Sequence, residues 1–264
     1  MAEPRPAAFP GAEPRPSASR MAGAASGALR RARSGRGRSG PRPLLPARRR
    51  RTAVALVAAC VAVIAVLGVL FAGQSRPDRF DAAVDAAVRS GAGAHAGLLD
   101  FLINFGNLPL VTVMTAALVL SCAAARWWRG AALAAVAVPA ASGLTELVLK
   151  RLIGRTLHGG PTYPSGHATV TFALAAVSAI LLTGPSCPQW PALARRLLML
   201  GAFLAAAAVS FATVALTFHY FTDIVGGAAL GTGAALLTAL LLDRVATAEP
   251  SGAPRITRPP PGRP

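Results

Sequence analysis

Two short stretches hold most of the side chains in this chain that can act as acids, bases or nucleophiles. The first runs from Lys150 to His167 and reads KRLIGRTLHGGPTYPSGH, and the second, His219–Asp223, reads HYFTD. Together they contain the single lysine and three of the four histidines of the sequence. Both stretches lie at the edges of long apolar segments. Imidazoles, an ammonium group and a carboxylate gathered at one site are suited to binding an anion and transferring protons.

The segment Pro-Ser-Gly-His that ends at His167 stands directly before an apolar helical run and has the residues of an anion site. Ser165 is a natural helix N-cap, and Gly166 lets the backbone approach a ligand closely. The free N–H groups and the positive dipole end of the helix favour an anion. Lys150 and Arg155 add full charges, so we predict that these four residues bind phosphate. On its own, such a helix start is usually only a cap.

His219 and Asp223 are four residues apart and share a face on a helix or its leading turn. Asp223 is expected to accept a hydrogen bond from Nδ1–H of His219, which presents Nε2 as a nucleophile. His167 would take the opposite part and donate a proton to the leaving group. The simpler interpretations are an interfacial hydrogen-bonded pair and a satisfied polar residue at a helix start.

The composition is too apolar for an ordinary soluble domain and indicates a membrane protein. Of the 264 residues, 53% are hydrophobic and 14% charged, and the mean hydropathy is +0.51. The apolar residues come in blocks long enough to cross a bilayer. We therefore predict an all-α fold, a bundle of six transmembrane helices within residues 53–242. The predicted spans are 53–73, 108–125, 131–149, 168–183, 197–217 and 224–242.

Both ends of the chain lack the residues of a folded core. Residues 1–52 are rich in Pro, Gly, Ser and Arg, with 13 arginines against two glutamates. We predict a disordered basic tail there and a second disordered, Pro/Arg-rich tail at 243–264. Because the basic run abuts an apolar span, the cytoplasmic face of a membrane is the expected partner, and nucleic acid is not. The cysteines are widely spaced, so neither a disulfide framework nor a zinc site is indicated, and we expect no metal and no cofactor.

Residues 74–108 are more polar and are predicted to form one or two amphipathic helices along the membrane surface. With the N-terminus inside, the loops obey the positive-inside rule except at Lys150, Arg151 and Arg155. Cations placed against this preference point to an anion ligand. Six spans with both termini in the cytoplasm bring the two reactive stretches to the same, outer face.

Two further residue pairs are expected to support the bundle. Glu146 lies one helical turn before Lys150, and an ion pair between them would position the lysine. Gly227 and Gly231 allow close helix contact, which we expect within the bundle rather than between chains.

The conjunction of these groups matches the needs of in-line phosphoryl transfer, and with it the chain resembles a known family. The residues that carry the resemblance are Lys150 and Arg155, Tyr163–His167, His219 with Asp223, and the Gly226-Gly227 pair. They resemble the type 2 phosphatidic acid phosphatase superfamily, which is related to vanadium haloperoxidases. The resemblance covers about residues 80–242. It implies a metal-independent phosphatase acting on membrane lipids, with His219 as nucleophile, Asp223 orienting it and His167 as general acid.

The chain departs from the family pattern at two phosphate-binding arginines. The first motif usually continues from the lysine to Arg-Pro, where this chain has Leu157 and His158. The third motif usually has an arginine six residues before the nucleophile, where this chain has Thr213. Arg155 is the nearby candidate to replace the first, and Arg151 or His158 are alternatives. The sequence does not say what replaces either arginine.

The leading hypothesis is an integral membrane phosphatase that hydrolyses a lipid phosphomonoester or diphosphate through a phosphohistidine. Its candidate substrates are polyprenyl phosphates, phosphatidate, phosphatidylglycerol phosphate and prenyl-linked sugar phosphates. Two alternatives stay open: a phosphotransferase that passes the phosphoryl group to another acceptor, and a non-catalytic protein that binds anionic lipids. The expected location is the plasma membrane, with the site on the outer face. The oligomeric state does not follow from the sequence.

Overall fold

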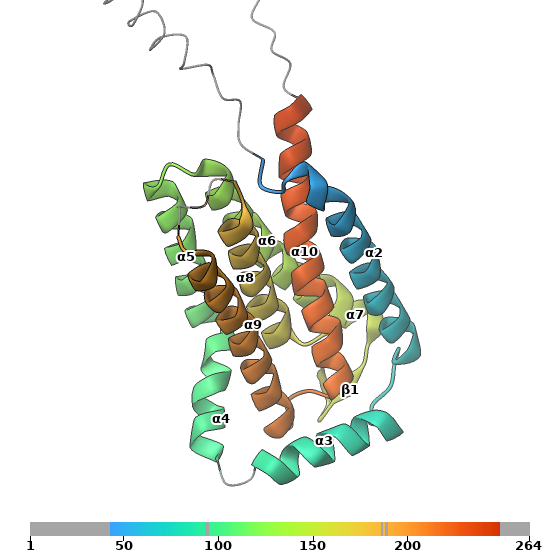
Figure 1. Ribbon diagram of the computed structural model, residues 1–264. Helices are drawn as coiled ribbons and strands as arrows, with labels where there is room; N and C mark the ends of the chain where they lie inside the picture. The colour runs from blue at the N-terminus through green and yellow to red at the C-terminus, as the bar shows by residue number, and fades with distance from the viewer. Residues whose placement is uncertain (1–42, 93–94, 186, 188–189, 249–264) are drawn as a thin grey trace, which may run out of the picture. The chain divides into compact units, whose positions relative to one another are not determined.

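The structure, a computed structural model, describes residues 43–92, 95–185, 187 and 190–248. The outer parts of both predicted tails, 1–42 and 249–264, lie outside the described residues. The elements follow the order shown in Figure 1. They are α2 (Ala47–Leu70), α3 (Arg79–Ala92), α4 (Ala96–Ile103), the 3₁₀ turn η1 (Asn104–Gly106), α5 (Leu108–Ala124), α6 (Trp128–Gly143), the π-helix η2 (Leu144–Leu149), α7 (Lys150–Ile153), β1 (Thr156–Leu157), β2 (Gly160–Pro161), α8 (Gly166–Thr183), α9 (Ala192–Ala215) and α10 (Phe221–Ala248).

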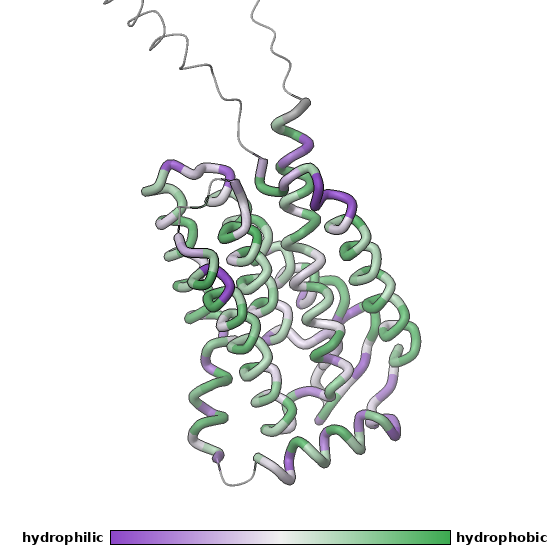
Figure 2. The backbone as a smooth tube through the Cα atoms, viewed as in Figure 1, coloured by the Kyte–Doolittle hydropathy of each residue, from purple (hydrophilic) through white to green (hydrophobic). Residues whose placement is uncertain are grey.

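The all-α membrane fold is confirmed. In the described chain, five helices are long and apolar enough to cross a membrane, or six when the bent pair of Ala96–Gly106 with α5 is taken as one span. The two parts of that pair are inclined by 53°. Apolar residues run along the whole length of these helices, whereas hydrophilic residues collect at the ends (Figure 2). This pattern is the one expected of helices that face hydrocarbon.

The folded part is longer at both ends than the predicted boundaries, 53 and 242. Leu44 and Leu45 are buried, and α2 begins at Ala47, inside the segment predicted to be disordered. At the other end α10 continues through Ala248, and Asp243 is buried. The two extensions hold each other, because the Asp243 carboxylate accepts hydrogen bonds from the backbone N–H groups of Leu44 and Leu45, at 2.8 and 2.9 Å. A hydropathy pattern does not reveal such a contact between the two ends.

Helix α8 is the most enclosed of the spanning helices, and α10 packs closely on it. The close approach depends on glycine. A Cβ at Gly227 would collide with the Ser165 carbonyl oxygen, and one at Gly231 with the carbonyl oxygen of Thr169. The predicted contact of these two glycines inside the bundle is therefore confirmed. It holds the start of α10 against the start of α8.

Helix α3 lies across one end of the bundle, next to the end of α9 and the start of α10 (Figure 1). It is amphipathic, as predicted, and its acidic side is the one packed on the bundle: Asp81 and Asp85 are buried, whereas Phe80 is exposed. Buried carboxylates need donors. They find them in the first residues of α10 and in Arg155.

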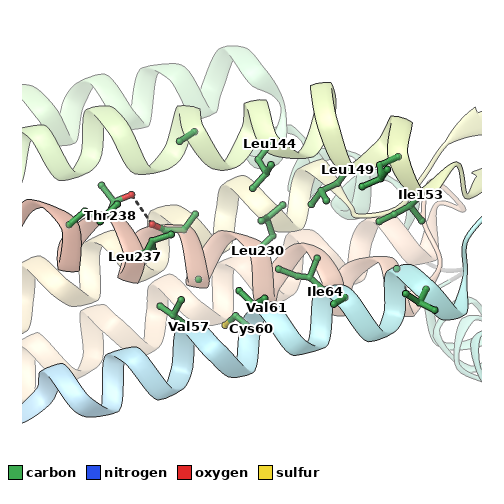
Figure 3. A pocket seen from close by; sticks show the side chains of 18 of the residues that line it. Val57, Cys60, Val61, Ile64, Leu144, Leu149, Ile153, Leu230, Leu237 and Thr238 are labelled. Carbon is green, nitrogen blue, oxygen red and sulfur yellow. Dashed lines mark hydrogen bonds between the residues drawn. The ribbon is translucent and has the colours of Figure 1, made fainter.

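The bundle also has an apolar groove of about 780 Å³ between α2, α10 and the α6–α7 segment. Side chains from all three sides point into it, among them Val57, Ile64, Leu144, Ile153 and Leu237 (Figure 3). The hydroxyl of Thr238 donates to the Ala234 carbonyl of its own helix. The groove contains none of the predicted site residues.

Candidate active site

A smaller pocket of about 310 Å³ gathers the reactive side chains at the end of the bundle that α3 covers. Lys150, His167 and His219 all line it, so their predicted convergence is confirmed. The two imidazole rings lie with centroids 6.3 Å apart. The remaining lining residues are Gly106, Asn107, Leu108, Val111, Ser142, Glu146, Gly166 and Val170. Arg155 is not among them.

The start of α8 has the structure that the Pro-Ser-Gly-His motif predicts. Ser165 is the N-cap, and its hydroxyl accepts from the N–H of Ala168 at 3.4 Å. Its own N–H donates to the backbone carbonyl of Asp223 at 3.0 Å, which ties the two reactive stretches together. At Gly166 a Cβ would lie 2.7 Å from Oε1 of Glu146 and 4.0 Å from Nζ of Lys150. Gly166 therefore leaves room for these two side chains beside the helix start.

Lys150 enters the pocket from the end of the π-helix η2. Its Nζ donates to both carboxylate oxygens of Glu146, at 2.8 and 2.9 Å, and the predicted ion pair is confirmed. The Glu146 side chain is 47% exposed, against 14% for Lys150. The π-helix continues directly from α6, which ends at Gly143. Segments of π-helix occur frequently at functional sites.

His167 is held by a residue that the sequence analysis did not single out. Its Nε2 lies 3.0 Å from Oδ1 of Asn107, and Nδ2 of Asn107 donates to Oδ1 of Asn104 at 2.9 Å. Asn107 stands at the bend between η1 and α5, next to Gly106. A Cβ at Gly106 would collide with the His167 ring, so the chain passes close to the imidazole there. The Asn-Phe-Gly-Asn-Leu-Pro sequence signals a turn but not its contact with α8.

Asp223, in the first turn of α10, is fully buried and surrounded by donors. Oδ1 accepts from Arg155 at 2.6 Å, while Oδ2 accepts from the Thr162 hydroxyl at 2.6 Å and the Tyr220 N–H at 3.0 Å. Nδ1 of His219 lies 3.7 Å from Oδ2, beyond hydrogen-bonding distance. The same nitrogen lies 3.0 Å from the Thr162 hydroxyl. The direct His–Asp hydrogen bond expected from the spacing is thus replaced by a contact through Thr162.

The structure places Arg155 behind the pocket, away from the position predicted for it at the phosphate. The side chain is fully buried and pairs with Asp81 at 2.5 Å and with Asp223 at 2.6 Å. Its guanidinium stacks between two aromatic rings, 4.0 Å from the centroid of Phe71 and 4.4 Å from that of Tyr220. The two carboxylates pair with the charge of the guanidinium group, and the two rings stack on it. Arg155 therefore supports Asp223 and does not replace a phosphate-binding arginine.

Asp81 and Asp85 of α3, which the sequence analysis did not assign to the site, also stabilise it. Asp81 accepts from the N–H of Thr222 at 2.9 Å and from its hydroxyl at 2.8 Å. Asp85 accepts from the N–H of Phe221 at 3.1 Å. These carboxylates act as caps for the positive end of α10. Burial raises the pKa of Asp85 to about 6, an effect larger than the opposing effect of the Phe221 hydrogen bond.

The positions where the family arginines are absent do not contribute charge to the pocket. Leu157 lies on β1, and Thr213 is buried in α9, where its hydroxyl donates to the Ser210 carbonyl. Arg151 and His158 are exposed and do not line the pocket. Among the lining residues, Lys150 alone carries a permanent positive charge. The N-terminus of α8 and the two imidazoles are the other groups able to favour an anion.

Comparisons with known proteins agree with this architecture. Residues 131–246 match the sequence model of the PAP2 superfamily. The fold is similar to the crystal structure of a transmembrane PAP2-type phosphatidylglycerolphosphate phosphatase from Bacillus subtilis, with a TM-score of 0.52 and 17% sequence identity. The similarity covers 73% of this chain and 96% of the other. No curated protein sequence matches the chain.

The predicted resemblance to the type 2 phosphatidic acid phosphatase superfamily is therefore confirmed, and the chain carries a PAP2 superfamily domain in a multi-pass membrane fold. The matched segment runs from α6 to α10 and contains all seven predicted site residues. The family and the fold together support a membrane phosphatase with a lipid substrate.

Proposed function

We propose that this protein hydrolyses a lipid phosphate, a phosphomonoester or a diphosphate, through a phosphohistidine formed on His219. The observation that carries the proposal is the single pocket in which the imidazoles of His167 and His219 stand 6.3 Å apart beside Lys150. That separation leaves room for one phosphorus centre between an attacking nitrogen and a proton donor. A buried network fixes the nucleophile from behind.

In the first step Nε2 of His219 attacks phosphorus and a nitrogen–phosphorus bond forms. The bond from phosphorus to the ester or bridging oxygen breaks, and His167 transfers a proton to that oxygen. In the second step water attacks the phosphohistidine, and His167 takes up the water proton as the nitrogen–phosphorus bond breaks. Orthophosphate leaves and both imidazoles return to their starting forms. Lys150 and the start of α8, with Ser165 and Gly166, hold the equatorial oxygens.

The placement in the membrane and the domain limits form part of the same proposal. We assign the catalytic unit to residues 43–248, which lies between two tails. The excess of arginine in the N-terminal tail and in the loops at Arg126 and Arg195 favours cytoplasmic termini. The site would then face outward, in the plasma membrane, where a lipid keeps its chains in the bilayer and presents its phosphate to the pocket. The proposed reaction uses no metal ion or other cofactor.

The test is phosphate release from a panel of lipid mono- and diphosphates by the full chain in detergent. Wild type should release phosphate with chelator present, and vanadate should inhibit because it mimics the five-coordinate transition state. His219→Ala should lower the rate by about 10³-fold or more. His95→Ala, a histidine exposed at the start of α4, is the matched control and should stay near wild type. Activity that survives His219→Ala would overturn the assignment of the nucleophile.

Labelled water separates hydrolysis from transfer, since both share the first step. Label from the water should appear in the released phosphate. Unlabelled product with the phosphoryl group on a second lipid or sugar would identify a phosphotransferase. Cellular function that survives loss of both His167 and His219 would instead favour a non-catalytic protein that binds anionic lipids.

A further inference from the structure

We infer that Thr162 is a positioning residue that sets the tautomer of His219 by linking its Nδ1 to the Asp223 carboxylate. The inference rests on the proposed function, in which Nε2 of His219 must carry a free lone pair. Thr162 is 2% exposed and lies in the loop before the Pro-Ser-Gly-His motif. Its hydroxyl oxygen stands 2.6 Å from Oδ2 of Asp223 and 3.0 Å from Nδ1 of His219.

The direction of the two hydrogen bonds follows from the number of protons available. A threonine hydroxyl has one proton to donate. The ion pair with Arg155 keeps the carboxylate of Asp223 ionised, so its Oδ2 can only accept, and it takes the hydroxyl proton. The hydroxyl can then only accept from Nδ1. A proton must therefore stand on Nδ1 of His219, which leaves Nε2 unprotonated in the neutral ring.

His219 and Asp223 make no direct hydrogen bond, and the carboxylate oxygen nearest to Nδ1 of His219, Oδ2, already accepts from two other donors. Oδ1 is held by Arg155, and Oδ2 receives the Tyr220 N–H as well as the Thr162 hydroxyl. Nδ1 of His219 stays 3.7 Å away. The backbone of Thr162 is fixed independently, since its N–H donates to the Arg155 carbonyl at 2.9 Å. The hydroxyl is thus held in place by the same residue that orients the carboxylate.

The same link also stabilises the intermediate. Once Nε2 carries the phosphoryl group, the ring gains positive charge. The hydrogen bonds from Nδ1–H to the Thr162 hydroxyl, and from that hydroxyl to the Asp223 carboxylate, stabilise this charge. Loss of the hydroxyl removes these hydrogen bonds but leaves Asp223 bound to Arg155. The chemistry at Nε2 then proceeds from a ring with no fixed tautomer.

The experiment compares Thr162→Val, which replaces the hydroxyl by a methyl group, with Thr162→Ser, which keeps it. Thr162→Val should lower kcat by about 10²-fold with a smaller change in KM, and Thr162→Ser should restore the rate to within a few fold of wild type. The acidic limb of the pH–rate profile should move to lower pH in Thr162→Val, because the protonated ring loses its acceptor. Thr222→Val is the matched control: its hydroxyl joins the same buried network, through Asp81 and Arg155. It should leave the position of that limb unchanged.

A second readout does not depend on turnover. In protein labelled with ¹⁵N at histidine, the imidazole shifts of His219, assigned by their loss in His219→Ala, should report a proton on Nδ1 in wild type and in Thr222→Val. In Thr162→Val the ring should become a tautomer mixture. A wild-type His219 protonated on Nε2, or a Thr162→Val enzyme with wild-type rate and profile, would overturn the inference. A wild type that releases no phosphate yet has the proton on Nδ1 would instead refute the proposed function alone.

Discussion

Helix α10 carries a buried aspartate at each end, and the two ends behave differently. Asp223 in the first turn and Asp243 near the end are exposed by 0% and 2%. Each carboxylate accepts from two or more donors: Asp223 from an arginine, a hydroxyl and a backbone N–H, Asp243 from Arg129 at 2.6 Å and the N–H groups of Leu44 and Leu45. Thr162, one of the donors to Asp223, also contacts Nδ1 of His219, which lines the pocket.

Burial and hydrogen bonding alone therefore do not distinguish the carboxylate proposed to support catalysis from one that only supports the fold. Both aspartates satisfy the rule that a buried charge is paired. The distinction lies in the partners: Asp243 joins the N-terminal segment to α6 and α10, whereas Asp223 leads to His219. The comparison predicts separate effects on activity and stability.

The largest expected effect comes from neutralising each aspartate in turn. Asp223→Asn should lower the phosphatase rate by about 10³-fold or more, the scale expected when the carboxylate that orients a catalytic histidine loses its charge. Asp243→Asn should leave the rate per folded molecule within about twofold of wild type. It should instead destabilise the protein by about 3 kcal/mol, because Arg129 loses a buried partner. Rates at saturating substrate and thermal unfolding in the same detergent measure both.

An Asp243→Asn protein that folds like wild type but loses its activity would contradict the prediction that only the Asp223 end of α10 supports activity. Equal rates for Asp223→Asn and wild type would contradict the proposed role of Asp223 in supporting His219.

The sequence predicted the key residues at the Asp223 end of α10 but not all of their contacts, and it missed the role of the Asp243 end, for physical reasons. The proximity of His219 and Asp223 and the Ser165 cap of α8 follow from local geometry and were predicted, but the direct hydrogen bond expected between His219 and Asp223 was wrong, because the Thr162 hydroxyl lies between them. Asp243 was assigned to a tail, because its partners Leu44 and Leu45 are far away in the sequence. Arg155 was predicted at the phosphate, since its charge can be read from the sequence but the buried acceptor on α3, Asp81, cannot. Thr162 was not singled out, because a threonine in a loop carries no signal until the fold places it between two ionisable groups.

Glu146 is a third carboxylate to compare with Asp223 and Asp243. Unlike the two aspartates it is not buried, and it can accept further hydrogen bonds. Its side chain is 47% exposed, lies beside Gly166 at the start of α8 and holds Lys150 with both oxygens. A bound phosphate would compete with this carboxylate for the lysine. Glu146→Gln should therefore bind anions more tightly, with a vanadate inhibition constant lower by about 3- to 10-fold, the scale of a partly exposed charge interaction. Vanadate titrations of the phosphatase activity measure the shift.

The control for this prediction is Lys150→Gln, which should weaken vanadate binding in the same assay. Weaker inhibition of Glu146→Gln than of wild type would show that the carboxylate supports the anion site through Lys150 instead of competing with its ligand.

The smallest expected effect concerns Asp85, a buried carboxylate whose hydrogen bond comes from the N–H of Phe221. Burial raises its pKa to about 6 from 3.8, so between those values the folded protein holds a proton that the unfolded chain has released. Stability from this group then rises as the pH falls from 7 to 4.5. Asp85→Asn removes the titration, so the difference in Tm, variant minus wild type, should decrease over that range. Thermal unfolding of both proteins in detergent measures it, with Asp100→Asn as the same charge change at an exposed position of α4. A difference that stays constant with pH would show that the Asp85 carboxylate is as well satisfied as Asp223 and Asp243, although its N–H donor is the backbone of a single residue.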